Sequence, residues 1–320
     1  MQVLDQYSTD RCVIYNADTV EVAQALQSES VDFSLFSPPF ASLYTYSNSD
    51  RDMGNVSSHE EFWEQYRYLI TEQFRVMKSG RNVAIHCMNL PTSKQNDGFI
   101  GLRDFRGDLI REYQAAGFIY HAEVCIWKCP VVAVTRTKAL GLLHKQVKKD
   151  SAMCRMGIPD YMIVMRKPGE NLDPVAGEFK YYVGENPPLG FDRVERHDGS
   201  YYWAPGPQNT SVDIWQKYAS PVWDDINQTD TLNFREGRED DDERHICPLQ
   251  LDVIERSLQL WSNPDDVVWT PFLGIGSEAY MAIRLGRRAI GVELKTSYYE
   301  LAKRNIDLAV DRQFDLFSVK

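Results

Sequence analysis

The chain has 320 residues, 43% of them hydrophobic and 25% charged, which is the composition of a globular protein with a large core. Its apolar stretches are far shorter than the ~18 residues of a membrane span, so we expect no membrane partner, and the amino terminus lacks the pattern of a secretory signal. The formal net charge of −11 argues against a nucleic-acid partner if it is averaged over the whole surface.

Short apolar segments alternate with amphipathic ones in the first half of the chain. This alternation predicts an α/β domain with a mostly parallel sheet. A segment rich in Ser, Asn, Tyr and Asp, residues 41–58, predicts a loop. We expect strands at 12–15, 31–36, 82–87 and 118–127, and helices at 20–26, 58–78 and 104–116, the last two ended by Gly80 and Gly117.

The pattern is interrupted between Pro168 and Arg244. This stretch has several Pro-Gly and Asn-Pro-Pro turns and many aromatic residues, too many for a disordered linker. It predicts an irregular inserted module, after which regular structure resumes at Pro248 and continues to about Arg312. We therefore expect three parts of the chain, at 1–167, 168–245 and 246–320.

The first candidate site directly follows the predicted strand at 31–36. It consists of Ser37, Pro38, Pro39 and Phe40. The Ser37 hydroxyl and the Pro38 carbonyl can accept hydrogen bonds from an exocyclic amine, which localises the lone pair of the nitrogen. The two prolines stiffen the loop before a base arrives. Phe40 offers a ring face, and stacking contributes commonly ~1–3 kcal/mol per base.

A second candidate site lies near the carboxyl terminus. A short apolar strand runs through Thr270, Pro271 and Phe272 into a glycine turn, and a helix from about Ser277 and a second strand follow. Within this βαβ unit, Gly274, Gly276 and Ala279 match the G-x-G-x-x-A nucleotide fingerprint, in which Gly274 allows the tight turn and Gly276 the close approach of a ligand. Glu293 stands where an acidic residue binds ribose hydroxyls.

The two sites together resemble the β class of the amino-group DNA methyltransferases, which use S-adenosylmethionine. In that class an S/D-P-P-Y/F block precedes the cofactor block. Further segments match it: the His245–Leu251 segment is similar to the H-x-x-P-L lead-in, Phe74–Gly80 to the "RVLKPGG" segment, and Gly117–Lys128 to the "GF…iiWxK" strand. The resemblance implies a Rossmann-like methyltransferase fold with a mostly parallel seven-stranded sheet and a circularly permuted motif order.

The resemblance also implies roles for individual residues. Ser37, Pro38, Pro39 and Phe40 take the place of the catalytic block. Thr270 replaces the usual aspartate that faces the cationic end of the cofactor. Because a threonine has no negative charge, we expect its interaction with that end to be weaker. The implied cofactor-binding residues are Asp18, Pro248, Leu249, Thr270, Phe272, Gly274, Gly276, Ser277 and Glu293.

The implied activity is methyl transfer from S-adenosylmethionine to an exocyclic amine of a flipped DNA base. Serine at the first position of the block resembles enzymes that act on N4 of cytosine, and N6 of adenine is the alternative. A catalytically weak DNA- or cofactor-binding protein on the same scaffold is a second hypothesis. A nicotinamide-dependent oxidoreductase is a third, but it leaves the Ser37 block unexplained.

Local charge makes DNA a plausible partner of an acidic chain. Between Lys128 and Lys167, nine basic residues face only two acidic ones, a local net charge of +7. The candidate DNA contacts are Arg136, Lys138, Lys145, Lys148 and Lys149. The inserted module is where the resemblance places target recognition.

The six cysteines are scattered through the chain, which is typical of a reducing cytoplasm. Cys125 and Cys129 lack a second pair of ligands, so no metal site is predicted. We therefore expect a cytoplasmic enzyme of a bacterial or phage-infected cell. The family resemblance adds a homodimer and a restriction endonuclease as candidate partners.

Overall fold

A computed structural model gives the structure of most of the chain. It describes residues 3–40, 53, 59–92, 94–132, 144–153, 156–176, 179, 191–196, 199, 201–205, 211–233 and 248–318. In this part of the chain, no helix is both long and apolar enough to cross a membrane.

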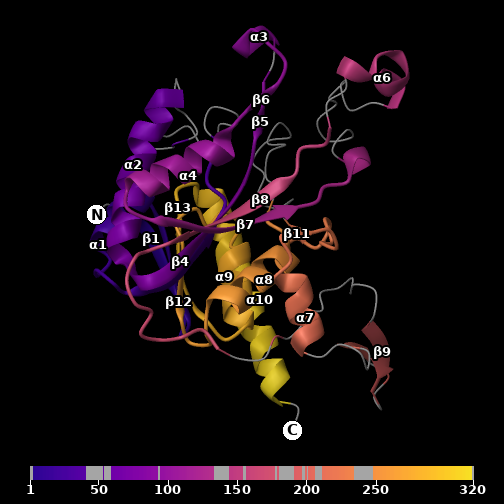
Figure 1. The fold of residues 1–320 in the computed structure, drawn as a ribbon. Helices are drawn as coiled ribbons and strands as arrows, with labels where there is room; N and C mark the ends of the chain where they lie inside the picture. The colour runs from indigo at the N-terminus through magenta and orange to yellow at the C-terminus, as the bar shows by residue number, and fades with distance from the viewer. Residues whose placement is uncertain are drawn as a thin grey trace.

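The described residues form a nine-stranded sheet at the centre of the molecule (Figure 1). The strand order is β1-β2-β13-β12-β3-β4-β8-β7-β11. The bounds of the strands are β1 Val3–Ser8, β2 Cys12–Ala17, β3 Val31–Phe36, β4 Met77–Met88, β7 Ile119–Ile126, β8 Asp160–Arg166, β11 Val222–Trp223, β12 Val267–Thr270 and β13 Arg288–Glu293.

The seven strands from β2 to β7 in this order form the expected, mostly parallel sheet. The neighbours from β2 to β4 are all parallel, whereas β8 runs antiparallel to β4 and to β7. Two further strands extend its edges: β1 pairs antiparallel with β2, and β11 pairs parallel with β7. Because β11 comes from the stretch predicted as an insert, part of that stretch is built into the main sheet.

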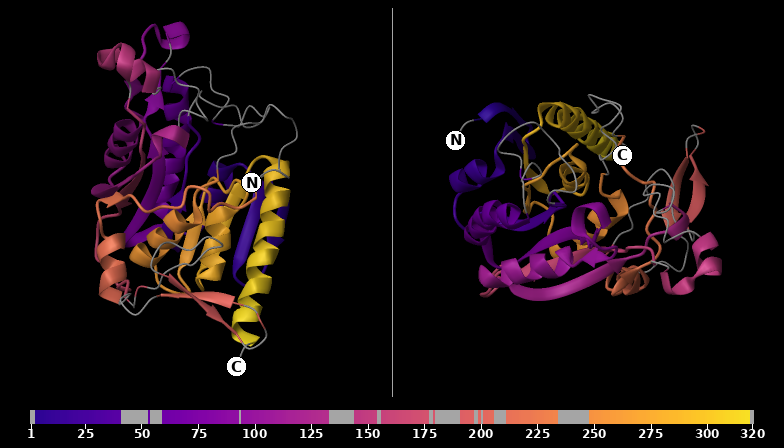
Figure 2. Two further views of the ribbon diagram at one scale, coloured as in Figure 1. Left: turned by 90° about the vertical axis from the view of Figure 1, so that its right-hand side faces the viewer. Right: turned by 90° about the horizontal axis from the view of Figure 1, so that it is seen from above.

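Helices cover both faces of the sheet (Figures 1 and 2). Each layer closes a separate apolar core, and all six residues of β3 are buried between the two. One face carries α1 Thr19–Ala25, α2 His59–Val76 and α4 Phe105–Ala115, and the other carries α8 Leu251–Trp261, α9 Ser277–Arg284 and α10 Thr296–Ser318.

Shorter elements lie outside these layers. In Figure 1, α3 and α6 stand at the top, away from the helical layers. These elements are β5 Leu90–Pro91, α3 Lys94–Asp97, β6 Leu102–Arg103, α6 His144–Lys149, a 3₁₀ turn Ser151–Met153, β9 Phe191–Glu195, β10 Tyr201–Pro205 and α7 Ser211–Tyr218.

The end of α2 differs from the prediction. The helix was expected to reach about Lys78 and to be ended by Gly80, but it ends at Val76 and β4 begins at Met77. Gly80 lies inside β4 with φ +74°, and a Cβ there would be 2.5 Å from the backbone nitrogen of Asn171. The glycine is therefore needed for the close approach of another chain segment and for its left-handed backbone.

The sheet brings together two segments that are far apart in the sequence. β3 and β12 are parallel neighbours, with Phe33 opposite Val268 and Ser34 opposite Trp269. The buried Ser34 hydroxyl donates a hydrogen bond of 2.9 Å to the Trp269 carbonyl. Since parallel neighbours end at the same edge of a sheet, the segments that follow β3 and β12 open onto one crevice.

Candidate active site

The Ser37–Phe40 segment begins where β3 ends. Ser37 and Phe40 are partly exposed, and the two prolines between them are buried. The Phe40 ring packs edge-on against Phe105 of α4, with centroids 6.1 Å apart. The buried strand and this ring contact fix the segment at the carboxyl edge of the sheet. Residues 41–52, which follow it, lie outside the described residues.

Ser37 is the first member of a chain of polar contacts. Its Oγ lies 2.7 Å from Nδ1 of His86, near the end of β4. The other ring nitrogen of His86, Nε2, lies 2.9 Å from Oδ2 of Asp160, the first residue of β8. Nζ of Lys128, two residues beyond β7, lies 2.6 Å from the same oxygen. Four separate segments thus contribute one continuous network.

The carboxyl group of Asp160 is ionised in this network. Burial by itself raises the pKa of Asp160, but the hydrogen bonds of His86 and Lys128 and the positive charge of Lys128 lower it by more. The pKa of Asp160 therefore lies below the usual value for an aspartate.

His86, Asp160 and Lys128 were not predicted as site residues from the sequence. A signal was present for the first two: His86 is a polar residue within the apolar run of its strand, and Asp160 opens another apolar strand. Their convergence depends on the antiparallel β4–β8 pairing, in which Met88 stands opposite Asp160 and His86 opposite Met162.

The glycine turn follows β12 at the same edge of the sheet. Gly274 and Gly276 have φ values of +54° and +89°, in the left-handed region that favours glycine. A Cβ on Gly274 would meet none of the described atoms within 4 Å, whereas a Cβ on Gly276 would lie 3.1 Å from Cβ of Ala302 in α10. Gly276 thus allows close packing against α10, and among the described residues no atom fills the space beside Gly274.

Glu293 is held over this turn by backbone donors. Its Oε2 accepts a hydrogen bond from the Gly274 nitrogen and its Oε1 accepts one from the Lys295 nitrogen, each 2.8 Å long. The side chain of Asn16, from β2, donates to the carbonyls of Glu293 and Leu294. The carboxylate is therefore oriented beside the glycine turn, where the fingerprint expects an acidic residue.

Two hydroxyl groups beside the turn are buried without a hydrogen-bond partner among the described residues. They are Oγ1 of Thr270 at the end of β12 and Oγ of Ser277 at the start of α9. Buried hydroxyl groups are normally satisfied, and unsatisfied ones indicate a ligand or water that completes them. Together with the open space at Gly274, they fit a nucleoside-type cofactor.

The two candidate sites touch through aromatic rings. Phe272, in the cofactor turn, lies 5.8 Å from Phe36, the residue before Ser37, between ring centroids. Phe272 also stacks on Tyr66 of α2, with centroids 6.2 Å apart and planes at 12°. The last residue of β3, which leads directly into the Ser37 segment, is therefore in contact with the cofactor turn.

The other predicted cofactor residues, Asp18, Pro248 and Leu249, lie on segments outside the glycine turn. Asp18 follows β2, the neighbour of β13, and its side chain caps α1 by accepting from the nitrogens of Val20 and Glu21. Leu249 is buried in the core and Pro248 is partly exposed just before α8.

The predicted DNA contacts are only partly described. Lys145, Lys148 and Lys149 are exposed on α6, whereas Arg136 and Lys138 lie outside the described residues. The chain leaves the sheet at Ile126 and returns at Asp160, so α6 belongs to a segment that starts and ends at the site.

The Ser37 segment and the glycine turn, which follow neighbouring parallel strands at one edge of the sheet, have the arrangement expected of a methyltransferase. The sequence matches the DNA methylase family, N6- and N4-specific, over residues 31–304, and the chain belongs to this family. It is therefore an S-adenosylmethionine-dependent DNA methyltransferase of the amino-group type.

Individual relatives are distant. The chain is 23% identical over 291 residues to the type II methyltransferase M.BglII of Bacillus subtilis, covering 90% of this chain and 67% of that protein. The fold is similar to that of a DNA modification methylase from Thermus thermophilus complexed with S-adenosylmethionine, with a TM-score of 0.60, 20% identity and coverage of 94% and 96%. It is also similar to the cytosine-N4-specific PvuII DNA methyltransferase, with a TM-score of 0.59, 14% identity and coverage of 98% and 97%.

Proposed function

We propose that the chain methylates N4 of cytosine in DNA. The observation that carries this proposal is the hydroxyl of Ser37, which stands at the carboxyl edge beside the cofactor turn and is held there by His86. Ser37 at the first position of the block resembles enzymes specific for N4 of cytosine. The cytosine-N4-specific PvuII DNA methyltransferase has a similar fold.

The target amine is paired in duplex DNA, so the base has to leave the helix, at a cost of a few kcal/mol. In the crevice, the Ser37 hydroxyl and the Pro38 carbonyl accept the two amine hydrogens, and Phe40 stacks on the ring. Pro38 and Pro39 hold these acceptors in place before the base arrives. Orientation and polarisation of the amine supply most of the acceleration, without a covalent intermediate.

When bound, S-adenosylmethionine supplies an electrophilic methyl group. Glu293 is placed to bind the ribose hydroxyls, and Gly274 leaves room for the cofactor. The hydroxyls of Thr270 and Ser277 provide polar partners near the turn, and Phe272 belongs to the same segment and packs against Phe36. Asp18, Pro248, Leu249 and Gly276 complete the proposed cofactor site, the last by packing against α10.

DNA is the macromolecular substrate, and α6 is the proposed contact with its backbone. Lys145, Lys148 and Lys149 present positive charge on an exposed helix. A homodimer, a restriction endonuclease partner and a cytoplasmic location are proposals from the family resemblance.

The experiment that tests this function is product analysis. PCR-amplified bacterial genomic DNA, which carries no modified bases, is treated with the enzyme and S-adenosylmethionine, digested to nucleosides and analysed by mass spectrometry. We expect N4-methyldeoxycytidine. N6-methyldeoxyadenosine as the sole product would show that the target base is adenine and not cytosine. The absence of both methylated nucleosides, together with no cofactor binding by calorimetry, would favour the catalytically weak scaffold.

A further inference from the structure

The polar network behind Ser37 raises the question of which atom carries which proton. Ser37, His86 and Asp160 form a continuous line of hydrogen bonds at 2.7 and 2.9 Å. His86 and Asp160 are both buried, at 9% and 6% exposure. Because the buried groups have few alternative partners, the proton arrangement within this line is determined by the groups themselves.

The ionised carboxylate of Asp160 determines the tautomer of His86. A carboxylate can only accept hydrogen bonds, so Nε2 of His86 has to carry a proton and donate it. In a neutral imidazole the other nitrogen, Nδ1, is then an acceptor. The Ser37 hydroxyl therefore donates its single hydrogen to Nδ1, and both lone pairs of its oxygen remain for a hydrogen-bond donor in the crevice.

A serine hydroxyl alone is a poor proton acceptor, because its conjugate acid is strongly acidic. An amine nitrogen that gains a methyl group has to lose one proton. The imidazole behind Ser37 can receive a proton that Ser37 passes on, and the Asp160 carboxylate stabilises the imidazolium that results.

We propose that His86, positioned by Asp160 and Lys128, keeps Ser37 in the hydrogen-bond-accepting state and takes up the proton released by the substrate amine. This inference rests on the proposed function. As the carbon–nitrogen bond forms, the methyl–sulfur bond breaks and its electron pair stays on sulfur. One amine proton moves to Ser37 Oγ while the original Ser37 proton moves to His86 Nδ1, and the imidazolium later releases a proton to water.

The order of atoms distinguishes this network from a hydrolytic triad. In a serine hydrolase the nucleophilic serine binds Nε2 of the histidine and the aspartate binds Nδ1. Here Ser37 binds Nδ1 and Asp160 binds Nε2. The three residue types are those of a hydrolytic triad, but here the histidine faces the serine with Nδ1 instead of Nε2.

The charged groups around His86 come from several other elements. Asp160 of β8 contacts the ring directly, and Lys128 after β7 contacts the same carboxylate. Arg106 of α4 and Glu123 of β7, which influence the adjacent Cys87, form an ion pair with each other. Among the described residues, the charged groups nearest to the His86 ring are therefore Asp160, in direct contact, and Lys128, one contact further away.

The first test needs only the protein without cofactor or DNA. Protein labelled with ¹⁵N-histidine is studied by NMR at neutral pH, with resonances assigned on the intact wild-type chain. We expect His86 as the neutral Nε2–H tautomer. A neutral Nδ1–H tautomer would overturn the proposal, because His86 would then donate to Ser37 instead of accepting from it.

The second test uses His86→Asn, whose amide oxygen can still accept from Ser37 but is not a base. We expect cofactor binding by calorimetry to be unchanged, and the single-turnover methylation rate to fall by roughly 10²-fold. A wild-type rate in His86→Asn would contradict the proposal.

His121→Asn is the matched control, because His121 is an exposed histidine on β7. It should leave the methylation rate unchanged. If the wild-type enzyme yields no methylated nucleoside, the proposed function fails. The NMR experiment needs no turnover and reports the His86 tautomer in either case. Failure of the proposed function and failure of the proposed proton arrangement are therefore distinguishable.

Discussion

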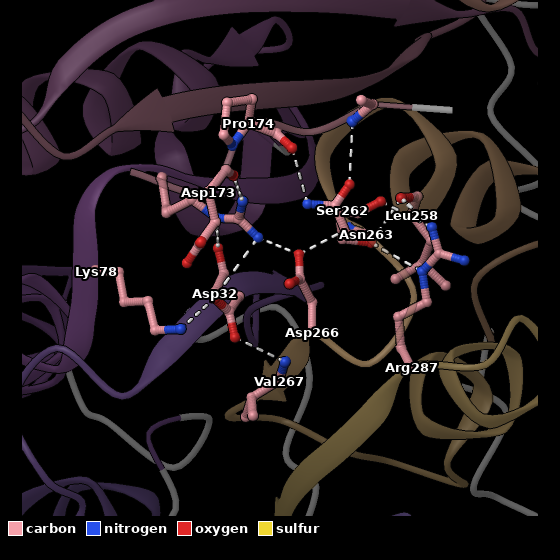
Figure 3. A network of polar contacts seen from close by, with 12 residues as sticks. Asp32, Lys78, Asp173, Pro174, Leu258, Ser262, Asn263, Asp266, Val267 and Arg287 are labelled. Carbon is pink, nitrogen blue, oxygen red and sulfur yellow. Dashed lines mark hydrogen bonds and ion pairs between the residues drawn. The ribbon is translucent and has the colours of Figure 1, made fainter. Parts of the chain in front are cut away.

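The two edges of the central sheet use polar residues in opposite ways. At the amino-terminal edge of β3 and β12, Arg81 donates to the Asp32 carbonyl and to the Asp266 carboxylate, and Asp32 accepts from the Val267 nitrogen. Figure 3 shows Asp32, Asp266 and Val267 in this buried network. At the carboxyl edge, the Ser37 oxygen and the hydroxyls of Thr270 and Ser277 keep acceptor or donor capacity for a ligand. We therefore expect substitutions at the first edge to change stability and substitutions at the second edge to change ligand binding or turnover.

The network at the amino-terminal edge joins the two halves of the chain. Arg81 of β4 donates to the carbonyls of Asp32 and Asp173 at 2.9 Å each, and it pairs with the Asp266 carboxylate. Asp32 in turn accepts from the Val267 nitrogen at 2.9 Å. β3, β4, β12 and the start of the predicted insert are thus tied together away from the site.

The largest expected effect is at this edge. Arg81→Met leaves buried carboxylates without their partner and should lower the free energy of unfolding by about 3–5 kcal/mol in urea denaturation. Cofactor affinity of the folded protein should be unchanged. Lys78→Met is the matched control, because Lys78 pairs with the same Asp32 but is 38% exposed, so it should cost less than about 1 kcal/mol. Equal losses in the two variants would refute the distinction.

At the opposite edge, the effect should fall on turnover and not on stability. Ser37→Ala removes one acceptor for the amine and should reduce the single-turnover rate by about 10²–10³-fold, as the loss of one preorganised group does in other enzymes. Binding of S-adenosylmethionine should persist in calorimetry. Ser79→Ala, whose hydroxyl binds Glu29 far from the site, should leave the rate unchanged. Full activity of Ser37→Ala would remove Ser37 from the mechanism.

A buried carboxyl group in α9 should make stability depend on pH. Burial raises the pKa of Glu278 to about 8. Below its unfolded pKa, such a carboxyl group is protonated in both states and does not lower the free energy of unfolding. As the pH rises from that value to about 8, the buried group lowers the free energy of unfolding progressively. Glu278→Gln should therefore stabilise the protein by about 4 kcal/mol at pH 8 and by almost nothing at pH 4.5.

Thermal unfolding across this pH range is the measurement for Glu278→Gln. Glu300→Gln provides the control, since Glu300 is an exposed side chain on α10 that pairs with Lys303. Its effect on Tm should be small at every pH. A pH-independent gain in Glu278→Gln would show that the pKa of Glu278 is not raised on folding.

The smallest effects separate the glycines. Gly274→Ala and Gly286→Ala both place an alanine at positive φ in open space and should each cost about 1–2 kcal/mol of stability. Only Gly274→Ala should also weaken binding of S-adenosylmethionine, by roughly tenfold, measured by calorimetry. Gly276→Ala should lower Tm further because its Cβ crowds Ala302. Equal cofactor affinity in the Gly274 and Gly286 variants would place the cofactor elsewhere.

Much of the fold could be predicted from local patterns. The apolar run of β3, the proline pair after it and the glycine turn after β12 are features of short segments, and each produced an element or a turn where it was expected. The end of α2 was mispredicted because Gly80 was taken as a helix stop. Its actual need for glycine comes from Asn171, which only the folded chain brings close.

The sequence by itself determined the α/β alternation, the Ser37–Phe40 segment and the Gly274–Gly276 turn, because these depend on side-chain period and backbone stereochemistry within a few residues. Tertiary structure decided the pairing of Ser34 with Trp269 across 235 positions and the convergence of His86, Asp160 and Lys128 on Ser37. Strand order sets these contacts, and strand order follows from packing of the whole core, which no local pattern contains.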